Sequence, residues 1–138
     1  MTIANTEHSR ITIEGIDEPT ISRYFETLNA GEFGQTAGLF AESGTLIAPF
    51  EEGVTGREAI EAYLSEEAKG LIAFPRQGTR EVFEDGSLQI VVVGKVQTPL
   101  FTVNVEWTFR LTPAGQIESV TVKLLANPRE LLNLRQFA

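Results

Sequence analysis

Hydrophobic and polar residues alternate along the segment VNVEWTFRL, residues 103–111. The hydrophobic positions are Val103, Val105, Trp107, Phe109 and Leu111. A period of two over this length predicts a β-strand with one buried face. Trp107 is the only tryptophan in the chain and belongs to that face. The pattern raises the question of whether its indole N–H serves the core or a bound molecule.

Short hydrophobic segments of this kind predict further strands, most of them in the second half of the chain. The strands are expected over residues 43–50, 78–84, 87–98, 101–111 and 117–126. Asp85–Gly86 separates two of them and predicts a hairpin turn. Pro99 marks a strand end or a bulge, because proline cannot donate a hydrogen bond to a neighbouring strand.

In the first half of the chain, the hydrophobic residues recur with the period of a helix. One hydrophobic face with the spacing i, i+3, i+4, i+7 consists of Ile21, Tyr24, Phe25 and Leu28. This spacing predicts a helix, with Asp17 as its N-cap and Gly31 at its C-terminal end. Further helices are expected over residues 32–40, 55–70 and 127–138. The helix at 55–70 should turn four carboxylates towards water: Glu58, Glu61, Glu66 and Glu67.

Helices followed by a long antiparallel meander predict an α+β fold. We expect a curved antiparallel sheet wrapped by the N-terminal helices into a cone, with a short C-terminal helix. Residues 1–15 are expected to form an N-terminal arm or a short edge strand, and residues 16–138 a single domain. A cone with a hydrophobic mouth is a natural site for a small molecule.

Composition narrows the possible partners. The formal charge is −8 and the sequence pI is about 4.7, so nucleic acid is not expected to bind an acidic surface. The chain has no cysteine and its one histidine, His8, lies in a polar segment. We therefore expect no disulfide and no metal site built on these residues. Without a signal peptide or a long hydrophobic run, the protein is expected in the cytoplasm.

Catalysis would require a carboxylate or histidine inside the cone, with a shifted pKa. Asn104, Glu106 and Arg110 alternate with Trp107 and are expected on the opposite face of their strand. The pattern leaves open which way Thr121 and Lys123 point. No acid–base pair stands out, so an enzyme is not the expected function.

Binding is the better match to the hydrophobic face. Tyr24 and Trp107 each combine a large hydrophobic body with one hydrogen-bond donor. Two such donors in a hydrophobic cavity suit a long apolar ligand that ends in one carbonyl oxygen. The pattern alone nevertheless favours a simpler interpretation, in which both side chains are core residues that donate to backbone carbonyls.

Several segments resemble the C-terminal domain of the orange carotenoid protein of cyanobacteria. They are GIDEPTISRYFETLNAGEF, LFAESGTL, PFEEGVTGREAIEAYLSEEA, GKVQTP and NPRELLNLR. The match runs from about Gly15 to Arg135 and places the chain in the nuclear-transport-factor-2-like superfamily. It resembles a form of that domain without the helical carotenoid-binding domain.

The resemblance implies that Tyr24 and Trp107 hydrogen-bond the keto oxygen of a ketocarotenoid. The non-covalent ligand would be canthaxanthin or echinenone. The pocket would also be lined by Phe25, Leu28, Pro99, Leu100, Val105 and Phe109. Related carriers hold one carotenoid between the two subunits of a homodimer. They pass it from membranes to helical carotenoid proteins and quench singlet oxygen, which implies transient membrane contact and a place near thylakoid membranes.

The chain departs from the family pattern at several positions. Leu100 stands where an aromatic residue is expected, Lys123 replaces an acidic residue, and no cysteine is available to cross-link a dimer. Glu67 matches a carboxylate that pairs with an arginine of the helical domain. Two alternatives stay open: a ligand-free interaction module that regulates carotenoid proteins, and an isomerase- or hydrolase-type enzyme of the same superfamily.

Overall fold

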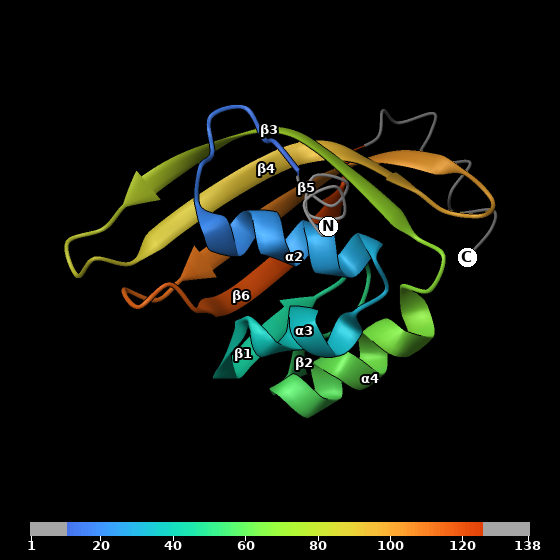
Figure 1. The fold of residues 1–138 in the computed structure, drawn as a ribbon, viewed down its shortest axis with the longest axis horizontal. Coiled ribbons are helices and arrows are strands. Elements are labelled where there is room, and N and C mark those ends of the chain that lie inside the picture. The colour runs from blue at the N-terminus through green and yellow to red at the C-terminus, as the bar shows by residue number, and fades with distance from the viewer. Residues whose placement is uncertain (1–10, 126–138) are drawn as a thin grey trace, which may run out of the picture.

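A computed structural model describes residues 11–125 as one curved sheet and the helices packed on it (Figure 1). The helices are α2 (Pro19–Asn29), α3 (Phe33–Gly38) and α4 (Arg57–Glu67). The strands are β1 (Phe40–Ile47), β2 (Val54–Thr55), β3 (Ile72–Val82), β4 (Leu88–Gln97), β5 (Thr102–Leu111) and β6 (Ile117–Leu124). The predicted α+β class is confirmed. The helix predicted over 127–138 lies outside the described residues.

The six strands pair in the order β2-β1-β6-β5-β4-β3. All neighbouring pairs are antiparallel except β1 and β6, which run parallel. A wholly antiparallel sheet was expected, and this one pair corrects it. The parallel pair arises because the chain leaves β1, passes through α4 and the meander β3–β5, and returns beside β1. In Figure 1, α2 lies across the long strands, while α3 and α4 lie beside β1 and β2.

Strand β3 starts at Ile72, six residues before the predicted start at residue 78. Pro75 obscured this extension, since proline usually argues against a strand. It is tolerated because β3 is an edge strand, and the pairing register with β4 shifts between Pro75 and Gln77. The segment before α2 covers part of this edge: Glu14 N–H donates to the carbonyl of Arg76.

The arm expected at residues 1–15 can be followed only from residue 11. Within it, Ile13 is buried in the core, and the Gly78 N–H donates to the Glu14 carbonyl at 2.9 Å. Residues 13–14 therefore lie against the edge of the sheet through an isolated bridge between Glu14 and Gln77.

Helix α2 turns its predicted face inward: Ile21, Tyr24, Phe25 and Leu28 are all buried. Its N-cap is Glu18 with no side-chain capping bond, so the prediction of Asp17 as the cap is wrong. Pro19 begins the helix with the dihedral angle that a first turn requires. Gly31 adopts φ +75°, the left-handed conformation that lets the chain leave a helix end.

The two shorter helices begin and end within the predicted segments. Helix α3 covers 33–38 of the predicted 32–40, because Phe40 already belongs to β1. Helix α4 covers 57–67 of the predicted 55–70, and its four carboxylates are exposed as expected. The Nε–H of Arg57 donates to the Phe40 carbonyl at 2.8 Å, which ties the start of α4 to β1.

One side chain joins α2 to the edge of the sheet. Asn29 donates from Nδ2 to the Ala73 carbonyl at 2.9 Å and accepts the Ala73 N–H at 2.8 Å through Oδ1. An amide side chain that satisfies both backbone groups of one residue acts like an extra strand partner. It fixes the last turn of α2 against the start of β3.

Candidate functional site

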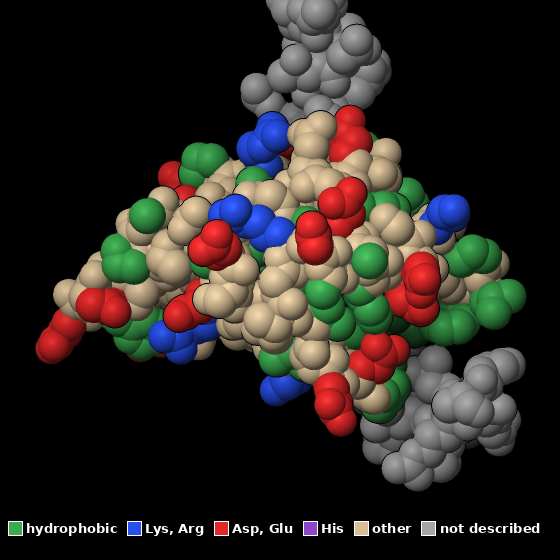
Figure 2. Space-filling model, turned by 90° about the horizontal axis from the view of Figure 1, so that it is seen from below, with side chains coloured by type: hydrophobic (Ala, Val, Ile, Leu, Met, Phe, Trp, Pro, Cys, Tyr) green, Lys and Arg blue, Asp and Glu red, His purple; other side chains and the backbone are tan. Residues whose placement is uncertain are grey.

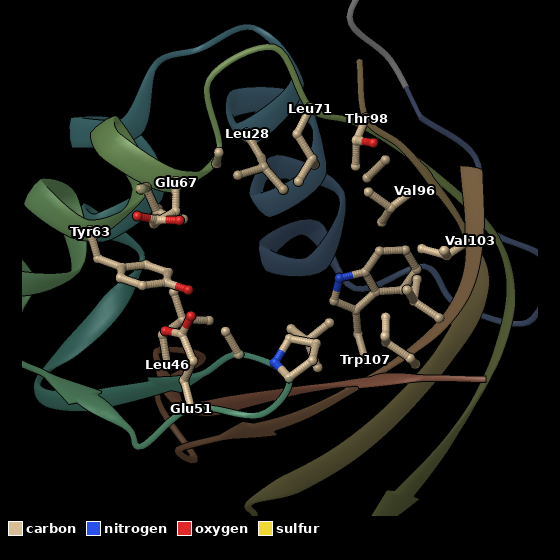
Figure 3. A pocket seen from close by; sticks show the side chains of 18 of the residues that line it. Leu28, Leu46, Glu51, Tyr63, Glu67, Leu71, Val96, Thr98, Val103 and Trp107 are labelled. Carbon is tan, nitrogen blue, oxygen red and sulfur yellow. The ribbon is translucent and has the colours of Figure 1, made fainter. Parts of the chain in front are cut away.

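A hydrophobic cavity of about 480 Å³ lies between the helices and the concave face of the sheet (Figure 3). Its walls come from α2, α4, β1, β3–β6 and the connecting loops. The lining residues are Tyr24, Leu28, Leu46, Ala48, Pro49, Phe50, Glu51, Tyr63, Leu64, Glu67, Ala68, Leu71, Ala73, Val96, Thr98, Leu100, Phe101, Val103, Val105, Trp107, Val122 and Leu124. The volume and the composition are those of a site for a small apolar molecule.

Tyr24 reaches the cavity from the middle of α2. Its ring is 2% exposed and lies edge-on to Phe25 and Phe109, with centroids 5.2 Å and 5.1 Å away. Burial raises the pKa of Tyr24 well above its usual range, because an apolar environment disfavours the charged phenolate. The hydroxyl therefore stays protonated and is available as a donor.

Trp107 reaches the cavity from the middle of β5. It is 2% exposed and packs edge-on against Phe25, with ring centroids 4.8 Å apart. Figure 3 shows its indole nitrogen turned towards the open space of the cavity. The neighbouring strands support this orientation from both sides, since Trp107 is paired with Val92 of β4 and Val122 of β6.

Neither donor is used by a backbone carbonyl within residues 11–125. The hydrogen bonds of these residues include none from the Tyr24 hydroxyl or the Trp107 indole. Both groups line the same cavity, so a ligand oxygen is a natural acceptor for them.

The opposite wall carries the polar groups Glu51, Tyr63 and Glu67 (Figure 3). The pKa of Tyr63 is raised to about 12, first by burial and then by a hydrogen bond with Glu51 and the charges of Glu51 and Glu67. Glu67 is exposed as expected, yet it also borders the cavity. No sequence pattern pointed to Glu51, because its place depends on how the loop after β1 packs against α4.

Hydrophobic side chains are exposed at the cavity mouth. Phe50 and Leu100 are each 85% exposed and Phe101 is 40% exposed, although all three line the cavity. Figure 2 shows hydrophobic side chains gathered towards the end of the molecule that carries the β4–β5 turn, beside several carboxylates. Phe50 also has φ +65°, a conformation that is unfavourable for a non-glycine residue.

The residues expected in the lining divide into two groups. Leu28, Leu100 and Val105 line the cavity. Phe25, Pro99 and Phe109 do not, which corrects their assignment. Phe25 and Phe109 are fully buried behind the rings of Tyr24 and Trp107, and Pro99 is exposed in the β4–β5 turn.

The lining residues missed by sequence reasoning include Leu46, Leu71, Val122 and Leu124. Their alternation marked them as buried, but no pattern separates a core position from a cavity wall. Val122 and Leu124 face the cavity, so Thr121 and Lys123 between them belong to the other face.

The polar residues of β5 lie on the outer face of the sheet, away from the cavity, and supply no acid–base pair to it. Asn104, Glu106 and Arg110 lie there, as the alternation predicted, and the Arg110 guanidinium stacks 4.8 Å from the Phe83 ring centroid. Residues 11–125 contain no group of three His, Asp or Glu side chains placed to hold a metal ion. No helix in the same range has the length and hydrophobicity to cross a membrane.

Residues 18–120 match the family model described as the nuclear transport factor 2 (NTF2) domain. The chain belongs to the NTF2 family. This NTF2 domain is 40% identical to the orange carotenoid-binding protein of Limnospira maxima over 133 residues, which are 94% of this chain and 42% of that protein. The chain thus spans about two fifths of the relative and corresponds to its C-terminal domain.

Solved structures agree with this assignment. The orange carotenoid protein of Anabaena (Nostoc), in a structure described as binding canthaxanthin, superposes on the NTF2 domain with a TM-score of 0.82. The two are 42% identical, over 90% of this chain and 41% of the other. The epoxide hydrolase/cyclase-like enzyme SalBIII, 22% identical over 77% of this chain and 88% of its own, has a TM-score of 0.59 and shares the fold alone.

Proposed function

We propose that this NTF2 domain binds a ketocarotenoid non-covalently, with the keto oxygen accepting hydrogen bonds from Tyr24 and Trp107. The observation that carries the proposal is that two buried side chains with hydrogen-bond donors, Tyr24 and Trp107, line one hydrophobic cavity. It is supported by the 42% identical Anabaena protein, which binds canthaxanthin. Canthaxanthin and echinenone are the ligands to test first, since both carry a ring ketone at the end of a long polyene.

The second part of the proposal is that two subunits share one pigment as a carrier. A carotenoid is about 30 Å long, comparable to the hydrocarbon thickness of a bilayer. A spherical cavity of 480 Å³ is only about 10 Å across, so one cavity covers one end. Two copies joined mouth to mouth would cover both ends and bury the exposed Phe50 and Leu100 side chains.

The third part concerns where the pigment comes from and goes. The carrier would take it up during brief membrane contact, in the cytoplasm near thylakoid membranes, and pass it to helical carotenoid proteins. Singlet-oxygen quenching would accompany pigment binding. The acidic surface supports brief contact, because anionic headgroups repel a protein with net charge −8.

Expression in a host that makes canthaxanthin tests the binding proposal. The expected product is a coloured protein whose pigment co-elutes on size-exclusion chromatography at the mass of a dimer. Extraction should give one pigment for two chains. A colourless protein purified from pigmented cells would contradict the proposal.

The exposed hydrophobic mouth also favours a second candidate, an interaction module that needs no ligand. That module would dimerise, or bind a helical carotenoid protein, equally well without pigment. Size-exclusion chromatography of pigment-free protein separates the two candidates. Dimerisation that is the same with and without canthaxanthin would support the interaction module.

A further inference from the structure

The charges that border the cavity are all of one sign. Among the described lining residues, Glu51 and Glu67 are the only charged side chains, and none is Lys, Arg or His. They stand on the wall that faces Trp107 across the open space, with Tyr63 between them (Figure 3). The site therefore offers the Trp107 donor on one side and the negative charges on the other.

The donors alone do not choose between a ketone and a carboxylate. Tyr24 and Trp107 are both more than nine-tenths buried and line the cavity, and their side-chain donors make no hydrogen bond within residues 11–125. A carboxylate oxygen accepts such hydrogen bonds more strongly than a neutral carbonyl does. Selection between the two groups must come from elsewhere in the cavity.

The charge of the cavity wall supplies that selection. A carboxylate that leaves water needs a cation or a dense set of donors, and the described lining provides no cation. It would also stand near two carboxylates. A sphere of 480 Å³ is about 10 Å across, comparable to the screening length of about 8 Å at physiological salt. The repulsion is thus only partly screened.

Tyr63 lies on the same wall as these two charges. The nearby carboxylates of Glu51 and Glu67 add to the effect of burial in raising the pKa of Tyr63, so its hydroxyl stays protonated at neutral pH. Glu67 lies on α4, one helical turn beyond Tyr63, so both residues project from the same side of the helix. The loop after β1 and the helix α4 therefore bring the two carboxylates to one wall.

We infer that Glu51 and Glu67 make this cavity reject apolar ligands that end in a carboxylate and accept those that end in a neutral carbonyl. The inference deepens the proposed function and rests on it. It assigns the charge selectivity to two residues outside the donor pair. The excluded class includes fatty acids and apocarotenoids oxidised to acids.

A matched pair of ligands tests the inference. An apocarotenal is a polyene that ends in one aldehyde, and the corresponding apocarotenoic acid differs only in that group. Quenching of Trp107 fluorescence reports binding, since it is the only tryptophan and lines the cavity. We expect the intact protein to bind the aldehyde at least about tenfold more tightly than the acid at neutral pH.

Charge removal should reduce this preference. Each exposed charge contributes a few-fold, so the double variant Glu51→Gln/Glu67→Gln should narrow the aldehyde-to-acid ratio by up to about tenfold. Glu66→Gln is the matched control, because Glu66 lies beside Glu67 on α4 but does not line the cavity. Its ratio should equal that of the intact protein. Because the readout is a ratio, a general loss of affinity does not imitate the effect.

The outcomes separate the inference from the proposed function. Equal affinity for the two ligands, or a ratio unchanged in the double variant, would overturn the inference. So would a protein that takes up canthaxanthin but neither apocarotenoid. A protein that binds none of the three ligands would contradict the proposed function instead.

Discussion

Trp107 belongs to the core and to the cavity at the same time. One edge of its ring packs against Phe25, while its indole nitrogen faces the open space. Removing the whole side chain would therefore damage folding and binding together. Only a substitution that keeps most of the aromatic packing and removes the N–H can separate the two roles.

Trp107→Phe is such a substitution. The loss of one donor should weaken canthaxanthin binding by about 0.5–1.5 kcal/mol and shift the absorption spectrum of the bound pigment. Glu106→Gln, on the outer face of the same strand, is the control and should leave both unchanged. A pigment spectrum identical in Trp107→Phe and the intact protein would show that the indole does not contact the keto oxygen.

Phe50 offers a second residue-scale test, because its backbone is strained and its side chain is exposed. Phe50→Gly should leave the free energy of unfolding unchanged or raise it by up to about 1 kcal/mol, since glycine accepts φ +65°. Pigment affinity should fall, because the aromatic ring at the mouth is lost. Urea unfolding and pigment titration measure the two effects.

The matched control for this test is Leu100→Gly. Leu100 is equally exposed, at 85%, but does not have a positive φ. It should lose about 0.5–1 kcal/mol of stability, because glycine gains more conformational freedom on unfolding. Equal stability losses at the two positions would mean that the strain at Phe50 is relieved in solution.

For single residues, the sequence predicted which face of a strand is buried but not which distant residues come into contact. The period of two placed Trp107 and Val105 inside and Glu106 outside, because alternation is a local property of a strand. The contact between Tyr63 and Glu51 was not predictable, since it joins a helix to a loop through packing. Phe25 and Phe109 were assigned to the lining because periodicity identifies buried residues without separating a wall from the layer behind it.

Among the elements, α2 and β3 are joined beside the cavity by a single side chain. Asn29 occupies both backbone hydrogen-bonding groups of Ala73, and Leu28 and Ala73 line the cavity beside this contact. The pairing makes the position of α2 depend on the edge strand. A substitution at Asn29 should therefore alter the cavity without changing any of its charged or donor groups.

Asn29→Ala tests this dependence. Losing two hydrogen bonds at the buried Ala73 should lower the free energy of unfolding by about 2 kcal/mol and speed hydrogen exchange of the Ala73 amide. Asn104→Ala, at an exposed position of β5, should change stability by less than about 0.5 kcal/mol. Urea unfolding and exchange measured by NMR give both quantities. Slow exchange at Ala73 in Asn29→Ala would show that the sheet edge holds itself.

Element boundaries followed the sequence where local chemistry decided them. Gly31 ended α2 and Asp85–Gly86 turned the chain between β3 and β4, because each supplies a conformation or hydrogen bond that the turn needs. The parallel pairing of β1 and β6 was not predicted. It joins segments about seventy-five residues apart, and no local pattern records which distant strand will be the neighbour.

The whole molecule combines a net charge of −8 with a hydrophobic mouth. Two copies that meet at their mouths repel each other through charge and attract through hydrophobic burial. Salt screens the first effect and leaves the second nearly intact. The proposed pigment-bound dimer should therefore respond to salt in one direction.

We expect the dimer to tighten when salt is raised from about 0.02 M to about 0.15 M, because the screening length falls from about 20 Å to about 8 Å. Sedimentation equilibrium of the pigment-bound protein measures the dissociation constant at each salt concentration. A dimer that weakens with salt would indicate ion pairs at the interface in place of hydrophobic contact.

The place of β6 in the sheet sets the time at which a cavity can exist. Of the strands described, β6 is the last to leave the ribosome, yet it stands between β1 and β5. Until it emerges, the walls contributed by β1 and by β5 have nothing to join them. A nascent chain therefore has no pocket to fill, and pigment can enter only after β6 has been synthesised.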